Sequence, residues 1–251
     1  MDYLTYLPYF IAFMFFLVEL IVPLKRSEFL TGEDKKNIFF IACNHVLEGT
    51  VLISAFLFVP GMIHEYLIDN HWLIIITESG MIWQGLACLL LIDVTAFVTH
   101  YLLHRVPFLW KIHRVHHRST NLNVLSSFRH SFLELGYHAF FLALIGSIVV
   151  VDSLAREIAT SIFTIACYFQ HANLKIKFPH SVNYFFITPK NHRWHHSLVN
   201  KLRFGQNFGF VFPFWDILCK TYYVPRNNDC SEFGVKERGS ASFLKELFFP
   251  F

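Results

Sequence analysis

Five apolar runs constrain the fold of this chain more than any other feature of its sequence. A helix needs about 20 predominantly apolar residues to cross a hydrocarbon core that is ~30 Å thick. The last two runs are separated only by Asp152 and Ser153, so the sequence is compatible with a transmembrane hairpin and with a re-entrant one. We predict an all-α integral membrane bundle of about four to five transmembrane or re-entrant helices. The runs cover residues 4–24, 38–59, 73–98, 132–151 and 154–170.

Composition excludes several other classes of protein. Hydrophobic residues make up 54% of the 251 residues and charged residues 16%, whereas soluble domains have about 25% charged residues. This low charge excludes a disordered chain and a coiled coil. The five cysteines are odd in number and never have a CxxC spacing, which excludes a secreted disulfide scaffold. A net charge of +3 is too small to indicate a nucleic-acid partner.

Basic residues predict which segments face the cytoplasm, because Lys and Arg concentrate in cytoplasmic loops. Segments 25–37, 99–131 and 171–251 contain all of the 21 Lys and Arg residues except Arg156. We therefore expect these three segments on the cytoplasmic side of a bacterial inner membrane or an endoplasmic reticulum. Segment 60–72 contains no Lys or Arg and is expected on the opposite side.

We interpret residues 1–251 as one domain, because the chain has no internal repeat, low-complexity segment or Gly/Ser-rich linker. The first apolar run has no basic segment before it and no small-residue cleavage site after it. It is therefore predicted to be a retained anchor rather than a signal peptide. Residues 1–98 are expected to form the membrane anchor helices, and residues 93–223 the catalytic region with a helical, histidine-rich cytoplasmic cap.

Histidines are the second unusual feature, since 15 occur in the chain and most are clustered. One pair has the spacing HxxxH, and two clusters downstream have the spacing HxxHH. Residues at i, i+3 and i+4 share one face of a helix, so each cluster directs two or three imidazoles at one point. Imidazole suits first-row metals such as iron, and this many ligands suit two ions better than one. The clustered residues are His100, His104, His113, His116, His117, His192, His195 and His196.

The remaining histidines are interpreted separately. An isolated histidine in an apolar segment is more often a hydrogen-bonded core residue than a metal ligand, and five histidines are interpreted in that way. His171 directly follows the last apolar run and is predicted to be a ninth ligand. His130 precedes the run 132–151, where we expect it to support a ligand rather than bind metal. The five isolated residues are His45, His64, His71, His138 and His180.

The order HxxxH, HxxHH, HxxHH resembles the fatty acid hydroxylase / sterol desaturase superfamily of integral membrane di-iron oxygenases. The resemblance extends over residues 93–223. Ser131 replaces a proline that is usual in the superfamily, and Cys219-Lys220 stands where Phe-Gly is common. Neither departure changes a predicted ligand. Other similar segments are Arg129-His130-Ser131-Phe132-Leu133-Glu134, Gln170-His171-Ala172-Asn173 and Trp215-Asp216 with Thr221.

This resemblance implies two iron ions that activate O₂ to hydroxylate or desaturate a lipid, such as a sterol or a fatty acyl chain. An all-nitrogen ligand set leaves coordination positions open for O₂, and zinc can replace iron on overexpression because its intrinsic affinity is higher. Asp93 lies seven residues before His100 on the same helix face and is expected to accept a hydrogen bond from a ligand. His130 and Asn173 are predicted to support the ligands in the same way.

Two other classes of function remain as alternatives. A membrane zinc hydrolase would contain HExxH, and the closest segment, His64-Glu65, lacks the second histidine. A histidine-rich metal-binding or transport protein would hold its ligands near the bilayer midplane, whereas these clusters lie at helix ends and in basic segments. The oxygenase interpretation accounts for all three clusters.

The chain shows no electron source of its own. It has no cysteine spacing typical of an iron–sulfur cluster and no GxGxxG segment for a flavin or nicotinamide. We therefore expect three partners: the membrane, a lipid substrate, and an external electron donor in the form of a reductase with a ferredoxin or cytochrome. The sequence does not rank the lipids, and it does not distinguish hydroxylation from desaturation.

Overall fold

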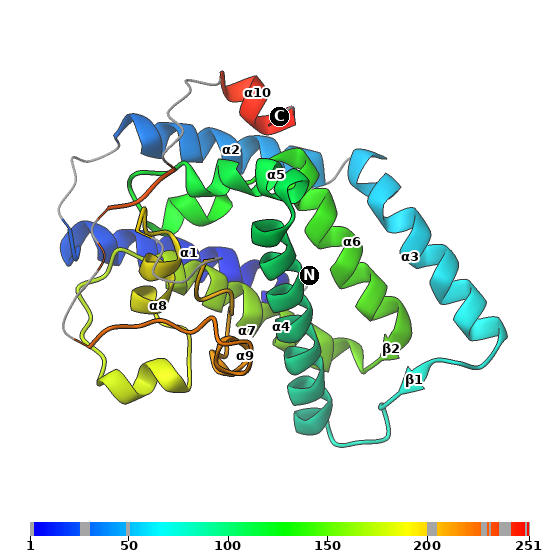
Figure 1. The fold of residues 1–251 in the computed structure, drawn as a ribbon. Helices are drawn as coiled ribbons and strands as arrows, with labels where there is room; N and C mark the ends of the chain where they lie inside the picture. Colours follow the sequence, from blue (N-terminus) through cyan, green and yellow to red (C-terminus); the bar gives the residue numbers. More distant parts are fainter. Residues whose placement is uncertain are drawn as a thin grey trace.

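The regular secondary structure of the computed structural model is almost all helical (Figure 1). It describes residues 3–25, 31–48, 51–199, 205–226, 230, 232–235, 242–248 and 250. Two strands of two residues each, β1 (Ile74–Ile75) and β2 (Val149–Val150), pair in parallel. The helices are α1 (Tyr3–Ile21), α2 (Gly32–Glu48), α3 (Val51–Asp69), α4 (Met81–Arg105), α5 (Pro107–His117), α6 (Phe132–Ile148), α7 (Ser153–His171), α8 (Pro189–His195), α9 (Phe214–Leu218) and α10 (Phe243–Phe248).

Five helices pack side by side in the spatial order α3, α6, α4, α7 and α1 (Figure 1). Small residues allow the close approach of α4 and α7. A Cβ atom on Gly85 would lie 3.9 Å from the Ala155 carbonyl oxygen, and Ala155 and Ala159 are 1% exposed. At this point the α7 backbone comes within van der Waals distance of the Gly85 position, and small residues at such contacts are common between membrane helices. This pair carries His100, His104 and His171 at one end.

The predicted span 38–59 is wrong, because its residues belong to two separate helices. Helix α2 ends at Glu48 and α3 begins at Val51. In the sequence the two are separated by Gly49 and Thr50, both weaker helix formers than Ala or Leu. Helix α2 also begins at Gly32, so residues 32–37 of the basic segment before this span are helical.

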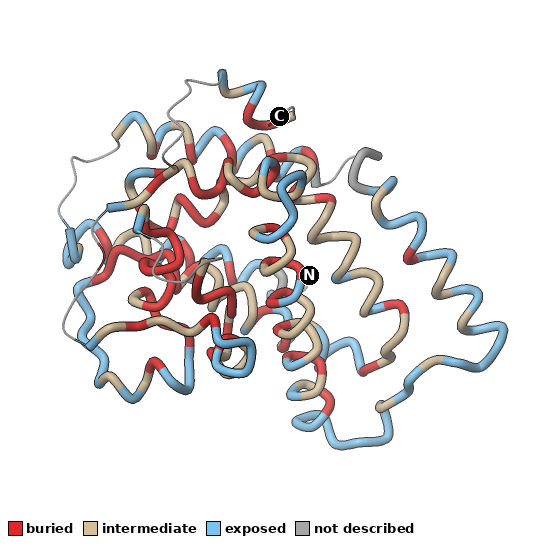
Figure 2. The backbone as a smooth tube through the Cα atoms, viewed as in Figure 1, coloured by how far each residue is buried: buried red, intermediate tan, exposed pale blue. Residues whose placement is uncertain are grey.

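Among the described residues, α4 is the one helix that is long and apolar enough by composition to cross a membrane. Helix α6 and residues Tyr6–Ile21 of α1 are apolar but shorter. Many large apolar side chains are nevertheless exposed along the bundle (Figure 2). Trp83, for example, is 69% exposed, and Phe58 on α3 is 67% exposed. Exposed apolar surface of this extent is typical of a surface that contacts lipid or another protein. The multi-pass bundle stays a prediction.

The three segments predicted to share the cytoplasmic side lie close together. Asp34 in α2 accepts a hydrogen bond from the Asn123 side chain at 2.6 Å. Glu246 in α10 forms ion pairs with Lys36 at 2.7 Å and with Arg129 at 3.1 Å. Arg129 is 1% exposed, so this ion-pair network is largely shielded from water. At the opposite end of α4, the β1–β2 pair connects the segments that precede α4 and α7.

A glycine allows α6 to pack closely against α3. A Cβ atom on Gly136 would lie 2.3 Å from the ring of Phe56, so Gly136→Ala forces that ring to move. We expect a loss of about 1–3 kcal/mol of stability, the usual cost of overpacking, measured as a lower midpoint of thermal unfolding in detergent. Gly146→Ala, on the same helix with no atom within 4 Å of its added Cβ, is the control. Equal midpoints for both variants would contradict this packing.

Candidate metal centre

Histidines from four helices converge in two adjacent groups. Helix α4 ends with one pair, α5 carries the first HxxHH cluster, α7 ends with His171, and α8 with the following residue His196 carries the second. Within each group, one nitrogen atom from every residue lies within 4.8 Å of those of all the other members. The first group comprises His100, His104, His113, His117 and His195, and the second comprises His116, His171, His192 and His196.

Local sequence features direct these side chains inward. Only Val106 separates α4 from α5, and Pro107 occupies the first turn of α5, where its missing N–H has no cost. Helix α8 begins with a capping box in which Thr188 and Asn191 exchange side-chain and backbone hydrogen bonds. Both short helices therefore have fixed starting points, and the i, i+3, i+4 spacing places three histidines of each cluster on the buried side.

Backbone carbonyls determine the tautomers of several imidazoles. His100 Nδ1 lies 2.9 Å from the Phe208 carbonyl oxygen, and His195 Nδ1 lies 2.9 Å from the Gln206 carbonyl oxygen. A carbonyl oxygen only accepts hydrogen bonds, so each Nδ1 carries the proton in the neutral ring. The Nε2 atom of each ring therefore has a free lone pair that points into its group.

These lone pairs face other imidazole nitrogens at short distances. His100 Nε2 lies 3.2 Å from His113 Nε2, and His195 Nε2 lies 3.0 Å from His117 Nε2. Lone pairs on neighbouring neutral rings repel each other unless a proton or a metal cation lies between them. His104 Nε2 is buried and has no hydrogen-bond partner within the described part of the chain. The residues present therefore fit metal ions, with an all-nitrogen donor set that suits iron or zinc.

Burial keeps the histidines outside the predicted membrane spans in the neutral form. It lowers the pKa of each well below the usual range for histidine, and the neighbouring imidazoles lower it further, since two nearby cations repel each other. A metal ligand must be deprotonated, so these side chains are ready to bind a cation at neutral pH. They are His116, His117, His192, His195 and His196.

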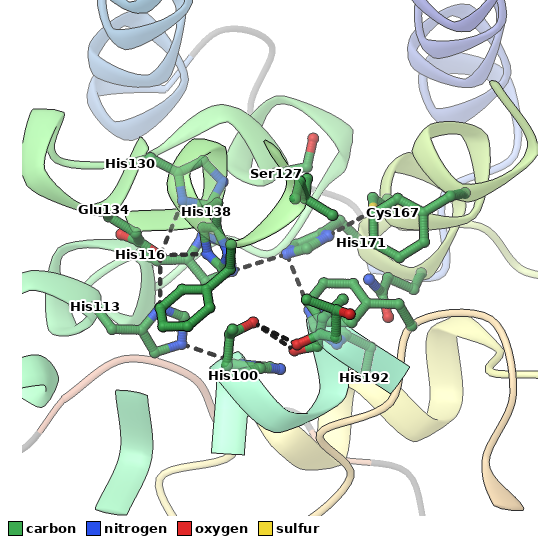
Figure 3. Close-up of a pocket in the computed structure, with 18 residues that line it drawn as sticks. His100, His113, His116, Ser127, His130, Glu134, His138, Cys167, His171 and His192 are labelled. Atoms are coloured by element: carbon green, nitrogen blue, oxygen red, sulfur yellow. Dashed lines mark hydrogen bonds and ion pairs between the residues drawn. The ribbon is translucent and has the colours of Figure 1, made fainter. Parts of the chain in front are cut away.

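Glu134 is a site residue whose role sequence reasoning missed. Its carboxylate is fully buried and accepts a hydrogen bond from His113 Nδ1 at 2.6 Å (Figure 3). It also lies 3.0 Å from His130 Nδ1 and 3.9 Å from His138 Nε2. Such a carboxylate orients a ligand imidazole and raises its basicity. The resemblance of segment 129–134 to the superfamily was the available signal, but it did not indicate that Glu134 contacts His113.

His130 lies where the sequence places it, beside a predicted ligand. Its ring stacks on His116 with centroids 4.9 Å apart and planes inclined by 5°, and it shares Glu134 with His113. The other five histidines lie outside both groups. The Nδ1 atom of His64, for example, lies 2.9 Å from the Ser147 carbonyl oxygen, as expected of an isolated histidine.

The structure contradicts the predicted contact between Asp93 and a ligand. Asp93 is fully buried in α4, and its carboxylate accepts hydrogen bonds from the backbone N–H groups of Val211 and Phe212 and from Trp215 Nε1. It therefore fixes the segment after α8 rather than an imidazole. That segment also carries the carbonyl oxygen of Phe208, which accepts from His100. Asp93 thus acts on the site through the backbone, which helical periodicity alone did not reveal.

Asn173 also differs from its predicted role. Its side chain exchanges hydrogen bonds with the backbone of Lys25, accepting at 3.1 Å and donating at 2.8 Å. Its backbone N–H donates to the carboxylate of Glu19 in α1. Asn173 therefore connects the end of α7 to the end of α1 and hydrogen-bonds to none of the clustered histidines.

A cavity of about 160 Å³ lies beside both histidine groups (Figure 3). Its histidine side includes His100 and His113 from the first group and His116, His171 and His192 from the second. Its other walls come mainly from α4, α6, α7 and the segment between α8 and α9. They are mainly apolar, with side chains such as Ala96, Phe141, Leu142, Phe163 and Phe210. An apolar chain in this cavity would therefore lie next to both candidate metal positions.

A family model described as fatty acid hydroxylase matches residues 85–221, more than half of the chain. The chain belongs to the fatty acid hydroxylase family. The superfamily predicted from the histidine clusters is thereby confirmed. The matched region contains all nine grouped histidines and every wall of the cavity. Membership in this family supports an oxidoreductase of lipid metabolism.

Curated relatives are hydroxylases or monooxygenases by name. The chain is 27% identical to the ornithine lipid hydroxylase OlsE of Rhizobium tropici over 193 residues, which are 75% of this chain and 54% of the relative. It is 25% identical to alkylglycerol monooxygenase of Caenorhabditis elegans over 174 residues, which are 66% of this chain and 32% of the relative. A cholesterol 25-hydroxylase-like protein of Danio rerio is 44% identical over 48 residues, 19% of each chain.

The chain thus spans about half of the length of the first relative and about a third of the second. Solved structures gave no significant match.

Proposed function

We propose that this fatty acid hydroxylase family member is a membrane-bound, non-haem di-iron oxygenase that hydroxylates or desaturates a lipid, using O₂ and external electrons. The observation that supports this most strongly is the pair of buried histidine groups beside one apolar cavity. A C–H bond of a lipid chain is not activated by any side chain, so its oxidation needs a metal or another cofactor. The cavity provides the place where such a bond would lie.

Two iron ions are the proposed cofactor, one for each histidine group. The first group would supply five imidazoles and the second four, and the bound iron would supply the O₂-activating chemistry. The chain's own contribution is to orient the imidazoles: His195 and His100 by backbone carbonyls, and His113 by Glu134. Zinc is the expected substitute on overexpression, because its intrinsic affinity exceeds that of ferrous iron.

We infer a multi-pass arrangement in the membrane, with the histidine groups near the cytoplasmic face. The basic segments 25–37, 99–131 and 171–251 support it. The exposed apolar side chains of α1, α3 and α4 support it as well. The cavity is lined by α4, α6 and α7, so we infer that a lipid would reach it from the bilayer, while electrons and protons would arrive from the aqueous side.

An external reductase with a ferredoxin or cytochrome is the proposed electron donor. A second, larger cavity of about 410 Å³ touches α8, the helix that carries His192 and His195. Five basic residues and no acidic residue line it. A surface of this charge favours an acidic partner and accelerates its association at low salt. The basic residues are Lys175, Lys177, Lys190, Arg193 and Arg226.

The alternatives are less well supported. A zinc hydrolase needs one ion with an open position, whereas these nine histidines form two groups. A transporter needs a path across the bilayer through the ligands, whereas both groups lie at the end of α4 where α5 begins.

Oxygen-isotope labelling tests the proposed activity. Membranes containing the chain and a reductase system are incubated under ¹⁸O₂, and their lipids are analysed by mass spectrometry against membranes without the chain. We expect ¹⁸O in a lipid hydroxyl group, whereas an unlabelled double bond would identify a desaturase. A parallel incubation with H₂¹⁸O and ordinary O₂ should give no labelled hydroxyl. Lipid conversion that continues without O₂ would exclude an oxygenase of either kind.

A further inference from the structure

The cavity beside the histidine groups contains one polar side chain that the site does not use. Gln170 is fully buried and lines the cavity. Neither its Oε1 nor its Nε2 has a hydrogen-bond partner among the described residues. The lining residues of α7 are Phe163, Cys167, Gln170 and His171. The last three lie four, seven and eight residues after Phe163, so all four share one helix face. The Gln170 amide therefore belongs to the face that forms the cavity wall.

The hydroxyl groups that line the cavity already have partners. The Thr95 hydroxyl donates to the Leu91 carbonyl oxygen at 2.7 Å, and the Thr99 hydroxyl donates to that of Thr95 at 2.8 Å. The Ser127 hydroxyl donates to the Val124 carbonyl oxygen at 2.6 Å. Glu134 accepts from His113. Among the described lining residues, Gln170 is the one with two side-chain polar atoms that both lack a partner, whereas Glu134 Oε2 and the Nδ1 atoms of His116 and His192 are single unpaired atoms of residues at the histidine groups.

A buried amide in this position destabilises the protein unless a ligand forms a hydrogen bond with it. A buried polar group without a hydrogen bond is destabilising, and buried polar groups in proteins are nearly always paired. A saturated hydrocarbon in the cavity would leave the amide unpaired, whereas an oxygen or nitrogen atom of a lipid would satisfy it. A site with a buried hydrogen-bonding group therefore rejects an analogue that lacks the matching group.

The location of Gln170 indicates where the polar atom of the lipid would lie. Gln170 directly precedes His171, a member of the second histidine group, and lies beside the histidine end of the cavity. Phe163 lies seven residues earlier, about 10 Å away along the helix axis, toward the apolar end. A polar group bound to Gln170 would therefore be close to the carbon atom that lies next to the metal.

We propose that Gln170 selects lipids that carry a hydrogen-bonding group, such as a hydroxyl, ether or amide, close to the carbon that is oxidised. This inference rests on the proposed function and specifies its substrate class. The amide would accept a hydrogen bond from a hydroxyl or N–H group, or donate one to an ether or carbonyl oxygen. The unsubstituted part of the chain would extend toward Phe163 and Leu142, where the lining is apolar.

Equilibrium binding to the purified chain in nanodiscs tests this proposal. The probes are ³H-labelled 1-O-hexadecylglycerol, ³H-labelled N-hexadecanoylethanolamine and ³H-labelled hexadecane, which share a chain length and differ in the polar end. We expect the wild-type protein to prefer at least one polar probe to hexadecane by about 10-fold or more, and Gln170→Leu to lose most of that preference. Thr99→Val is the matched control, because the Thr99 hydroxyl is already bonded within its own helix.

The readouts separate this inference from the proposed function. Binding is measured alongside metal content and ¹⁸O incorporation into each probe or into endogenous lipid. Equal affinity of the wild-type protein for hexadecane and both polar probes overturns the role of Gln170, as does an unchanged preference in Gln170→Leu. Binding of none of the probes overturns it too. A wild-type protein without metal or ¹⁸O incorporation contradicts the proposed oxygenase instead, whatever its probe preference.

Discussion

Replacing His195 by alanine should reduce the metal content of the purified protein from two ions to one and leave lipid turnover undetectable. His195 belongs to the group of five histidines, and its Nε2 lies 3.0 Å from that of His117. Loss of this imidazole changes the charge and the coordination of one ion, and O₂ activation depends on both. Elemental analysis measures the ions per chain, and the ¹⁸O₂ assay measures turnover.

His64→Ala is the matched control for this experiment. His64 is also a histidine in an apolar segment, but its Nδ1 contacts the Ser147 carbonyl oxygen and it lies outside both histidine groups. We expect this variant to retain two ions and turnover. Metal loss from His64→Ala, or two ions in an inactive His195→Ala protein, would show that the ligand assignment is wrong. One ion in the active wild-type protein would contradict the di-metal proposal itself.

The helical part of the site was predictable from the sequence because its spacing is local. The i, i+3, i+4 pattern in α5 and α8 places imidazoles on one face whatever the rest of the chain does. His171 was also predictable, since it directly follows the last apolar run. The structure brings these histidines into two groups, and the division into five and four depends on how α4, α5, α7 and α8 meet, which no local pattern contains.

Contacts between distant segments account for the parts that sequence reasoning missed. Helical periodicity placed Asp93 on the same face as His100, but its carboxylate reaches the segment around Val211, more than a hundred residues away. Run length likewise predicted a single span from 38 to 59, although two helices occupy it. Hydropathy averages over a window, so it does not detect that one helix ends at Glu48 and the next begins at Val51.

Replacing Glu134 by glutamine should weaken metal binding and turnover by about 10–100-fold, the usual cost of losing a carboxylate that orients a metal-binding histidine. The Glu134 carboxylate accepts from His113 Nδ1 and contacts His130 Nδ1. Both rings contact the same oxygen, Oε1, so an amide of the same size keeps that acceptor. It loses the negative charge, however, and with it most of the effect on the basicity of His113. The backbone N–H of Glu134, bonded to the Ser131 hydroxyl, is unchanged, so α6 should still begin at the same residue.

Glu246→Gln distinguishes this effect from a general loss of stability. Glu246 is also a buried glutamate, 3% exposed. Burial alone would raise its pKa, but Lys36 and the guanidinium groups of Arg129 and Arg118 hold that pKa below the usual range. Its stabilising effect is therefore present above about pH 4.5, the usual glutamate range, and is lost as the pH falls through the lowered pKa.

At neutral pH, Glu246→Gln should lower the midpoint of thermal unfolding and leave metal affinity unchanged, because its ion pairs involve no histidine among the described residues. Glu134→Gln should lower the metal affinity, measured by competition with a chelator, and leave the midpoint of thermal unfolding unchanged. If both variants lose stability alike and neither loses metal affinity, Glu134 supports the fold rather than the orientation of His113. A metal affinity that falls only in Glu134→Gln assigns the carboxylate to the metal centre, because both variants remove a buried negative charge and only one of them changes a contact with a histidine.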